Sequence, residues 1–288
     1  GGLPLQKWVT TGTWAGTGQG RHRGLPLQNM GNHGGLPLRR ITILTGGIHA
    51  MRNYTGCSGY NYKNWQGKFY PRDLPRKKWL EYYAGKFDTV EINNSFYRLP
   101  DKKTLNNWYD QVPGNFRFTL KGSRYVTHLK KLNQTGEAVK KFYDRAGLLK
   151  GKLGCILWQL PGNQHKDTEK LEKFCRTLSR DFRNVMEFRH NSWYDEEVYE
   201  VMKSYGVIFC VISAPDGLSD EAVKTAGHVY MRFHGRNSWY RDQYSTKELR
   251  GWSQKLQRLK PKQIYAYFNN DYQAYAPENA REFQEMIG

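Results

Sequence analysis

Short apolar runs alternate with amphipathic stretches along the chain from Met51 to its end. The apolar runs are typical of buried strands and cover residues 54–58, 89–93, 117–121, 154–160, 184–189, 207–213, 228–234 and 263–269. The stretches with helical periodicity cover residues 76–86, 101–111, 136–148, 168–180, 195–205, 219–226, 246–259 and 277–287. Eight strands, each followed by a helix, predict an α/β fold, a (β/α)8 barrel formed as one domain by residues 51–288. A doubly wound open sheet is the alternative, but the sequence lacks its Gly-rich phosphate-binding turn.

Residues 1–50 do not follow this pattern. The sequence G-L-P-L recurs at 2–5, 24–27 and 35–38, and the segment contains no Asp or Glu. Imperfect repeats without apolar periodicity cannot bury a core, so we predict a disordered leader. It is either upstream sequence that precedes a natural start at Met51, or a basic tail that helps to bind an anionic partner.

Charged residues interrupt several apolar runs near their C-terminal ends, as in N-V-M-E-F-R at 184–189. Alternate residues of a barrel strand point into the barrel, and the others point towards the helices. Met186 and Phe188 should therefore face the helices, while Glu187 and Arg189 face inwards. The same rule predicts that the inward polar side chains are Glu91, Asn93, Lys121, Gln159, Glu187, Arg189, Arg232, His234 and Asn269. They should meet at the C-terminal mouth of the barrel, where barrel enzymes carry their active sites.

The predicted mouth contains more cations than anions. Lys121, Arg189 and Arg232 accompany only Glu91 and Glu187, so the site should attract an anionic substrate, and Arg can hold phosphate or carboxylate with two hydrogen bonds. A structural alternative is a buried network in which Glu91 pairs with Lys121 and Glu187 with Arg232. Such networks seldom stabilise a fold better than apolar packing does, so we favour the functional interpretation.

Several chemical roles are open to these residues. Glu187 or Glu91, kept ionised by neighbouring cations, suits a general base, with His234 as the acid. The two carboxylates with His234 could instead hold a divalent metal, although no spaced metal-binding motif is present. Lys121 could form a Schiff base if a neighbouring Arg lowers its pKa.

The loops predicted to follow the first and seventh strands, residues 60–70 and 235–244, mix aromatic and basic residues. This mixture suits base stacking beside phosphate contacts, although the aromatic residues could simply pack the loops. From these and other loops of the mouth we take the following as candidate binding residues: Trp65, His128, His190, Arg236 and Tyr240.

The net charge and the cysteines bear on the binding partner and on the cellular compartment of the protein. The formal net charge of +19 favours an anionic small molecule or nucleic acid as partner, or simply a well-solvated surface. The four cysteines lie far apart without a C-x-x-C pair, so reduced, mostly buried thiols in a cytoplasmic protein are expected. No apolar run is long enough for a membrane helix. The oligomeric state is left open.

Seven ordered motifs resemble the YecE-like family, domain of unknown function seventy-two. They are G-C-S-G-Y-N-Y with W-Q-G-K-F-Y-P (56–71), T-V-E-I-N-N-S-F-Y-R-L-P (89–100), F-T-L-K with V-T-H (118–128), L-W-Q-L-P (157–161), M-E-F-R-H-N-S-W (186–193), Y-M-R-F-H-G-R (230–236) and Y-F-N-N-D (267–271). The resemblance implies a TIM-type barrel similar to xylose isomerase and endonuclease IV, and brings no assigned reaction. Its signature positions include Tyr97 besides the inward polar set. The trinuclear zinc site of endonuclease IV would need more His and carboxylate ligands than this mouth offers.

We therefore carry three hypotheses forward. The first is an enzyme, a hydrolase or lyase, that acts on a phosphorylated or otherwise anionic substrate. The second is a nucleic-acid-binding or repair-associated protein without turnover. The third is an aldolase-like enzyme that uses Lys121 as a Schiff-base amine.

Overall fold

The computed structural model describes residues 52–288, so the predicted leader at residues 1–50 lies outside the described part. Eight parallel strands close into a barrel in chain order, with the last strand paired to the first. They are β1 (Tyr54–Ser58), β2 (Thr89–Ile92), β3 (Arg117–Lys121), β4 (Leu153–Gln159), β5 (Asn184–Glu187), β6 (Ile208–Ser213), β7 (Val229–Phe233) and β8 (Ile264–Phe268). The predicted TIM-type barrel is confirmed, and all eight strand runs are found within one or two residues of their expected bounds.

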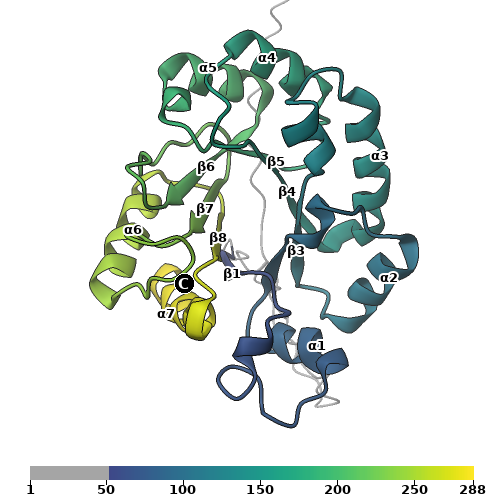
Figure 1. The fold of residues 1–288 in the computed structure, drawn as a ribbon, viewed down its shortest axis with the longest axis vertical. Helices are drawn as coiled ribbons and strands as arrows, with labels where there is room; N and C mark the ends of the chain where they lie inside the picture. Colours follow the sequence, from purple (N-terminus) through teal and green to yellow (C-terminus); the bar gives the residue numbers. More distant parts are fainter. Residues whose placement is uncertain (1–51) are drawn as a thin grey trace, which may run out of the picture. The chain divides into compact units, whose positions relative to one another are not determined.

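Seven α-helices of the described region surround the strands (Figure 1). They are α1 (Trp79–Ala84), α2 (Lys102–Gln111), α3 (Gly136–Ala146), α4 (Thr168–Thr177), α5 (Glu196–Tyr205), α6 (Thr246–Arg258) and α7 (Tyr275–Ile287). Helix α6 begins with a capping box, in which the Ser245 side chain accepts from the backbone of Glu248 and the Glu248 side chain accepts from the backbone of Ser245. None of the helices of residues 52–288 is long and apolar enough to cross a membrane.

The helix predicted at residues 219–226 is wrong, because this segment is irregular. The buried hydroxyl of Thr225 accepts from the backbone N–H of Phe209 (2.8 Å) and donates to the carbonyl of Val207 (2.6 Å). The side chain of Asn191 accepts from the backbone N–H of Ser219 (2.9 Å). These side-chain hydrogen bonds hold the segment to Val207, to Phe209 of β6 and to Asn191, in place of the backbone hydrogen bonds of a helix.

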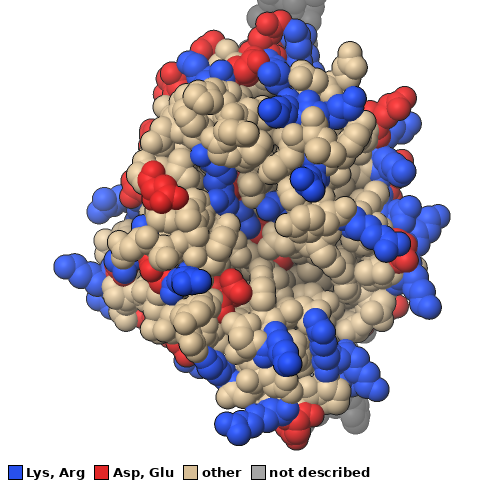
Figure 2. All heavy atoms as spheres, in the orientation of Figure 1, with Lys and Arg blue, Asp and Glu red and all other residues tan. Residues whose placement is uncertain are grey.

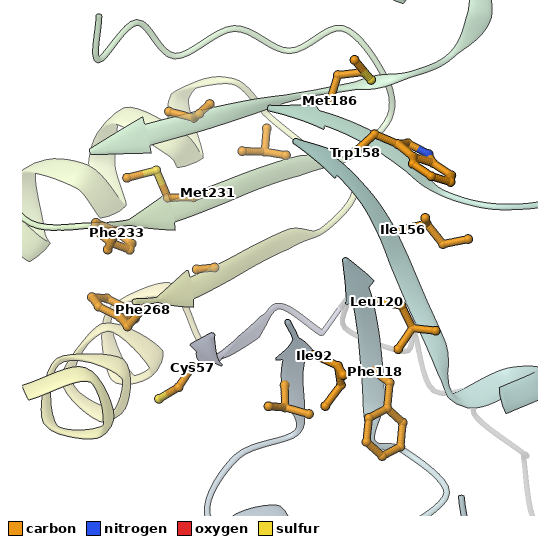
Figure 3. Close-up of a cluster of buried hydrophobic side chains, with 14 of the residues drawn as sticks. Cys57, Ile92, Phe118, Leu120, Ile156, Trp158, Met186, Met231, Phe233 and Phe268 are labelled. Carbon is orange, nitrogen blue, oxygen red and sulfur yellow. The ribbon is translucent and has the colours of Figure 1, made fainter. Parts of the chain in front are cut away.

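The barrel strands separate two apolar clusters, as the alternation rule requires. The inner cluster fills the barrel and consists of Tyr54, Cys155, Leu157, Val185, Ile208, Cys210, Ile212, Tyr230, Tyr265 and Tyr267. The outer cluster packs the strands against the helices, and Figure 3 shows part of it, including Phe118, Trp158 and Met231. The rings of Phe233 and Phe268 stack there with centroids 4.2 Å apart. Residues expected to face the helices are therefore found in the outer cluster.

All four cysteines lie in the described part, and each is a free, buried thiol, as predicted. Burial raises the pKa of the Cys155 thiol to about 12, so it stays protonated at neutral pH. These thiols contribute to packing rather than to a reactive surface.

Candidate functional site

A guanidinium group joins two carboxylates at the centre of the barrel mouth. Arg232 on β7 donates to Glu91 on β2 (2.5 Å) and to Glu187 on β5 (2.6 Å). All three side chains are buried, with exposed fractions of 1%, 0% and 0%. Because these strands are not neighbours in the barrel, the side chains meet only by pointing inwards. The predicted convergence of Glu91, Glu187 and Arg232 is therefore seen, and Glu187 pairs with Arg232 as the structural alternative expected.

The other oxygen of Glu187 is paired with Arg189, whose Nε donates to it. Burial by itself would raise the pKa of Glu187, but the two neighbouring guanidinium groups outweigh burial and hold the pKa well below its ordinary value. The predicted ionised state of Glu187 thus has a physical cause. The same contacts make this carboxylate a weak base, because a proton would have to displace a guanidinium group.

His234 lies beside these guanidinium groups and is completely buried. Its Nε2 is 3.0 Å from Nη2 of Arg189 and 3.3 Å from Nη1 of Arg232, and its Nδ1 is 3.2 Å from the amide of Asn269. Burial, followed by the charges of Arg189 and Arg232, holds the pKa of His234 well below its ordinary value. His234 is therefore neutral at physiological pH. A neutral imidazole is a weak acid, so the lowered pKa disfavours the predicted role of His234 as the acid partner of Glu187 or Glu91.

Lys121 completes the charged set from the end of β3, but it does not pair with Glu91 as the structural alternative expected. Its ammonium lies 4.5 Å from the ring centroid of Phe96, and among residues 52–288 it forms no salt bridge. Burial first, and the charge of Arg232 second, lower the pKa of Lys121 to about 8. The lysine is therefore a cation without a carboxylate partner within the described region.

Three further polar side chains complete the inner wall of the mouth. Asn93 donates to the carbonyl of Ser58 (3.2 Å), and its amide oxygen has no hydrogen-bond partner among the described residues. Gln159 is half-buried at the end of β4. Tyr230, which the sequence interpretation missed, donates to Glu91 (2.6 Å). Its place two residues before Arg232 on the same strand was the signal that could have identified it.

A cavity of about 600 Å³ opens beside this cluster. It is lined by His128, Gln159, Pro161, Gly162, Arg189, His190, Asn191, Asp216, Leu218 and Trp239. The indole of Trp239 covers Arg189, with 4.5 Å between the guanidinium carbon and the ring centroid, and its Nε1 donates to Asp216. Neither Trp239 nor Asp216 is among the residues that the sequence predicts at the mouth. Figure 2 shows Lys and Arg atoms in the central hollow of the visible face.

Two histidines of the predicted rim border this cavity. His128 lies in a turn of π-helix, Tyr125–Leu129, and burial followed by Lys121 and Arg124 lowers its pKa. His190 stacks on His165 with ring centroids 3.9 Å apart. Both are thus placed where a ligand in the cavity would contact them.

Tyr240 and Tyr97 lie on the rim. The exposed ring of Tyr240 is 5.9 Å from that of His234, and Tyr97 is 77% exposed in a short helix after β2. Tyr97 touches Phe96 in an edge-to-face arrangement. Both rings are available to a ligand larger than the cavity.

Trp65 and Arg236 are not brought to the inner wall. Trp65 is completely buried and packs against Tyr62 and Tyr70, so a ligand cannot contact it in this conformation. Arg236 pairs with Glu248 at the start of α6. The alternative of simple loop packing describes Trp65 better than a binding role does.

The metal alternative gains no support from the donor geometry. Within residues 52–288 no group of three or more His, Cys, Asp or Glu side chains is arranged to hold a metal ion. The guanidinium of Arg232 also binds an oxygen of each carboxylate, Glu91 and Glu187, which a shared metal would need.

Fold and mouth together define a TIM-type barrel protein with a buried charged cluster at the C-terminal ends of its strands. The chain belongs to the family described as protein of unknown function DUF72, which matches residues 54–288. The resemblance suggested by the seven motifs is thereby confirmed.

Relatives of known sequence support this membership. The UPF0759 protein YunF of Bacillus subtilis is 24% identical over 269 residues, which cover 81% of this chain and 94% of YunF. The UPF0759 protein YecE of Escherichia coli (strain K12) is 29% identical over 116 residues, 40% of this chain and 43% of YecE.

Solved structures of the same family share the fold. A DUF72 family protein from Thermotoga maritima is 30% identical with a TM-score of 0.76, covering 82% of this chain and 99% of that protein. One from Enterococcus faecalis is 22% identical with a TM-score of 0.71, covering 81% of this chain and 94% of that protein. The family description names no reaction, so the chemistry has to be argued from the site.

Proposed function

We propose that this protein is an enzyme that acts on a phosphorylated or otherwise anionic small molecule at the C-terminal mouth of the barrel. One observation carries the proposal: within residues 52–288, the largely buried cluster contains three cations, Arg189, Arg232 and Lys121, but its salt bridges involve only the two carboxylates Glu91 and Glu187, and neither is paired with Lys121. An uncompensated charge in such a place is costly. A bound anion would supply the missing negative charge.

The cavity gives this anion a place to bind. Arg189 lines it, and its Nε and Nη2 are engaged by Glu187 and His234, so Nη1 is the guanidinium nitrogen that no other residue of the described range 52–288 binds. Trp239 restrains the guanidinium from one side. A group held in this way is preorganised, which lowers the cost of binding.

The charged side chains of the site fall into a fixed set and one residue that can exchange a proton. Glu91, Glu187 and Arg232 hold one another in fixed positions. A pKa of about 8 leaves Lys121 able to gain or lose a proton near neutral pH, which general acid–base catalysis requires. Glu187 and Glu91 therefore serve as electrostatic supports of the reaction, while Lys121 handles protons.

The test is calorimetric titration with inorganic phosphate and with a panel of phosphorylated sugars, followed by product analysis for each compound that binds. Lys121→Met should weaken binding about tenfold, which corresponds to about 1.4 kcal/mol. The matched control is Arg236→Met, which removes a cation paired with Glu248 outside the cavity. Equal binding by both variants, or no binding by the wild type, would contradict the proposal.

A second candidate, nucleic-acid binding without turnover, is favoured by a different observation. Four tyrosines with exposed rings, Tyr97, Tyr125, Tyr240 and Tyr272, all follow the C-terminal ends of strands. Exposed aromatic rings and a net charge of +19 suit stacking of bases beside phosphates. If this candidate is right, the protein binds single-stranded DNA or RNA with an affinity that falls steeply as salt is added. The variants Tyr97→Ala and Tyr240→Ala should each lose this affinity.

A further inference from the structure

Lys121 occupies an unusual position for a lysine in a protein interior. It ends β3, two residues after Thr119, whose hydroxyl is 2.8 Å from the hydroxyl of Tyr267 inside the barrel. Lys121 therefore also points inwards. Its nitrogen rests on the face of Phe96, which is itself almost fully buried.

Lys152 provides a contrast within the same chain. Its side chain is buried, whereas that of Lys121 is half-buried, and its ammonium donates to the carbonyls of Tyr109 (2.5 Å) and Val112 (2.6 Å). Those two contacts hold it in place as a hydrogen-bond donor. Within residues 52–288, the nitrogen of Lys121 has neither a carbonyl nor a carboxylate partner of this kind.

The carboxylates close to Lys121 are already occupied. Glu91 accepts from Arg232 and Tyr230, and Glu187 accepts from Arg232 and Arg189. Neither is left to fix Lys121 as an ammonium ion. The nitrogen of Lys121 lies over the ring of Phe96, and that ring packs edge-to-face on His128 at the wall of the cavity, with centroids 4.9 Å apart. Within residues 52–288, a lysine without a counter-ion therefore lies next to the proposed anion site.

We propose that Lys121 forms an imine with a small aldehyde or ketone that carries a phosphate or carboxylate group, and that Arg189 binds this group in the cavity. The inference rests on the proposed function and names its substrate class. The lysine nitrogen attacks the carbonyl carbon, and the π electron pair moves to oxygen. The carbonyl oxygen then leaves as water with two hydrogens that came from the ammonium group. The carbon–nitrogen double bond that remains keeps one hydrogen and the positive charge, so atoms and charge balance.

The surroundings favour this chemistry. With a pKa of about 8, roughly a tenth of Lys121 is the free amine at pH 7, about 300 times the fraction for an ordinary lysine. The free amine is the nucleophile in imine formation. The positive imine also replaces the ammonium charge, so the charge balance with Glu91 and Glu187 is kept.

The experiment traps the imine by reduction. The full chain is incubated with glyceraldehyde 3-phosphate, pyruvate or uncharged glyceraldehyde in the presence of sodium cyanoborohydride, and the labelled lysine is located by peptide mass mapping. We expect Lys121 to be labelled at least tenfold faster by one of the two anionic carbonyl compounds than by glyceraldehyde. Inorganic phosphate should suppress this labelling, and its rate should rise with pH up to about 8. Lys152 and the exposed Lys77 serve as internal controls and should be labelled slowly in every arm.

Two variants separate this inference from the proposed function. Lys121→Arg keeps the positive charge but cannot form the imine, so it should bind inorganic phosphate like the wild type and give no adduct at this position. Lys121→Met should lose the adduct and weaken phosphate binding. If wild-type protein binds phosphate but Lys121 is labelled no faster than Lys77, the imine is wrong and the anion site stands. If the wild type neither binds phosphate nor is labelled at Lys121, both proposals fail.

Discussion

Arg232 and Glu187 lie 2.6 Å apart with both side chains removed from solvent, and the same guanidinium also binds Glu91. Breaking a buried ion pair by removing one partner leaves the other charge uncompensated, which costs about 3–5 kcal/mol. These contacts of Arg232 therefore couple the positions of β2, β5 and β7 to the charge state of the site.

Replacing Arg232 by Met should be strongly destabilising. It leaves the buried carboxylates of Glu91 and Glu187 facing each other, so we expect the free energy of unfolding to fall by about 3–5 kcal/mol. Guanidinium chloride denaturation followed by circular dichroism measures this. The control is Arg236→Met, which removes an exposed pair with Glu248 and should change stability by less than about 1 kcal/mol. Similar denaturation midpoints for both variants would refute the assigned role of Arg232.

The imidazole of His234 should remain neutral throughout the physiological range. Burial and two guanidinium groups lower its pKa in the folded protein, whereas the unfolded chain takes up a proton near pH 6.5. The unfolded state therefore binds more protons below this pH, and His234 makes folding less favourable as the pH falls below about 6.5. Nitrogen-15 NMR of the imidazole, assigned with a His234→Asn variant, should show no titration between pH 6 and 8. A midpoint near 6.5 would mean that the Arg contacts do not govern its charge.

Lys121 should leave a signature in the pH dependence of stability. Its pKa is about 8 in the folded protein against an ordinary value of 10.5. Between pH 8 and 10.5, Lys121 of the unfolded chain keeps a proton that it has released in the folded protein. The contribution of Lys121 to the free energy of unfolding therefore rises with pH in this range. The free energy of unfolding of wild type relative to Lys121→Met should thus increase by about 1–3 kcal/mol from pH 8 to 10.5. A difference between wild type and Lys121→Met that does not change with pH would count against the lowered pKa.

Trp239 should act through Arg189. A cation–π contact of this kind is worth about 0.5–2 kcal/mol, and its loss frees the guanidinium that the cavity presents. Trp239→Leu should therefore weaken binding of inorganic phosphate by about 2- to 30-fold in calorimetric titrations. Gln243→Ala on the same loop, whose side chain contacts Glu278 instead, should leave the affinity unchanged. If the two variants bind inorganic phosphate equally well, Trp239 does not position Arg189 for the anion.

Patterns local to each strand were sufficient for most of the architecture. Apolar runs marked all eight strands, and alternation assigned Met186 to the outer cluster and Glu187 to the interior. These predictions succeed because a barrel strand has only two faces, so one buried apolar face determines where the other points. The helix predicted at 219–226 failed because Thr225 and Asn191 bind backbone groups that a periodicity pattern does not take into account.

The chain's order of apolar and polar residues thus specified a closed barrel and the identity of the side chains at its mouth. Which charges meet there was decided only by folding, because Glu91, Glu187 and Arg232 come from strands β2, β5 and β7 and their separations depend on the closure of the barrel. In the closed barrel, Arg232 forms salt bridges with both carboxylates, and Lys121 forms a salt bridge with neither. It also surrounded His234 with guanidinium groups, which makes the imidazole neutral. Protonation states follow from distances across the barrel, and no local pattern of residues encodes such distances.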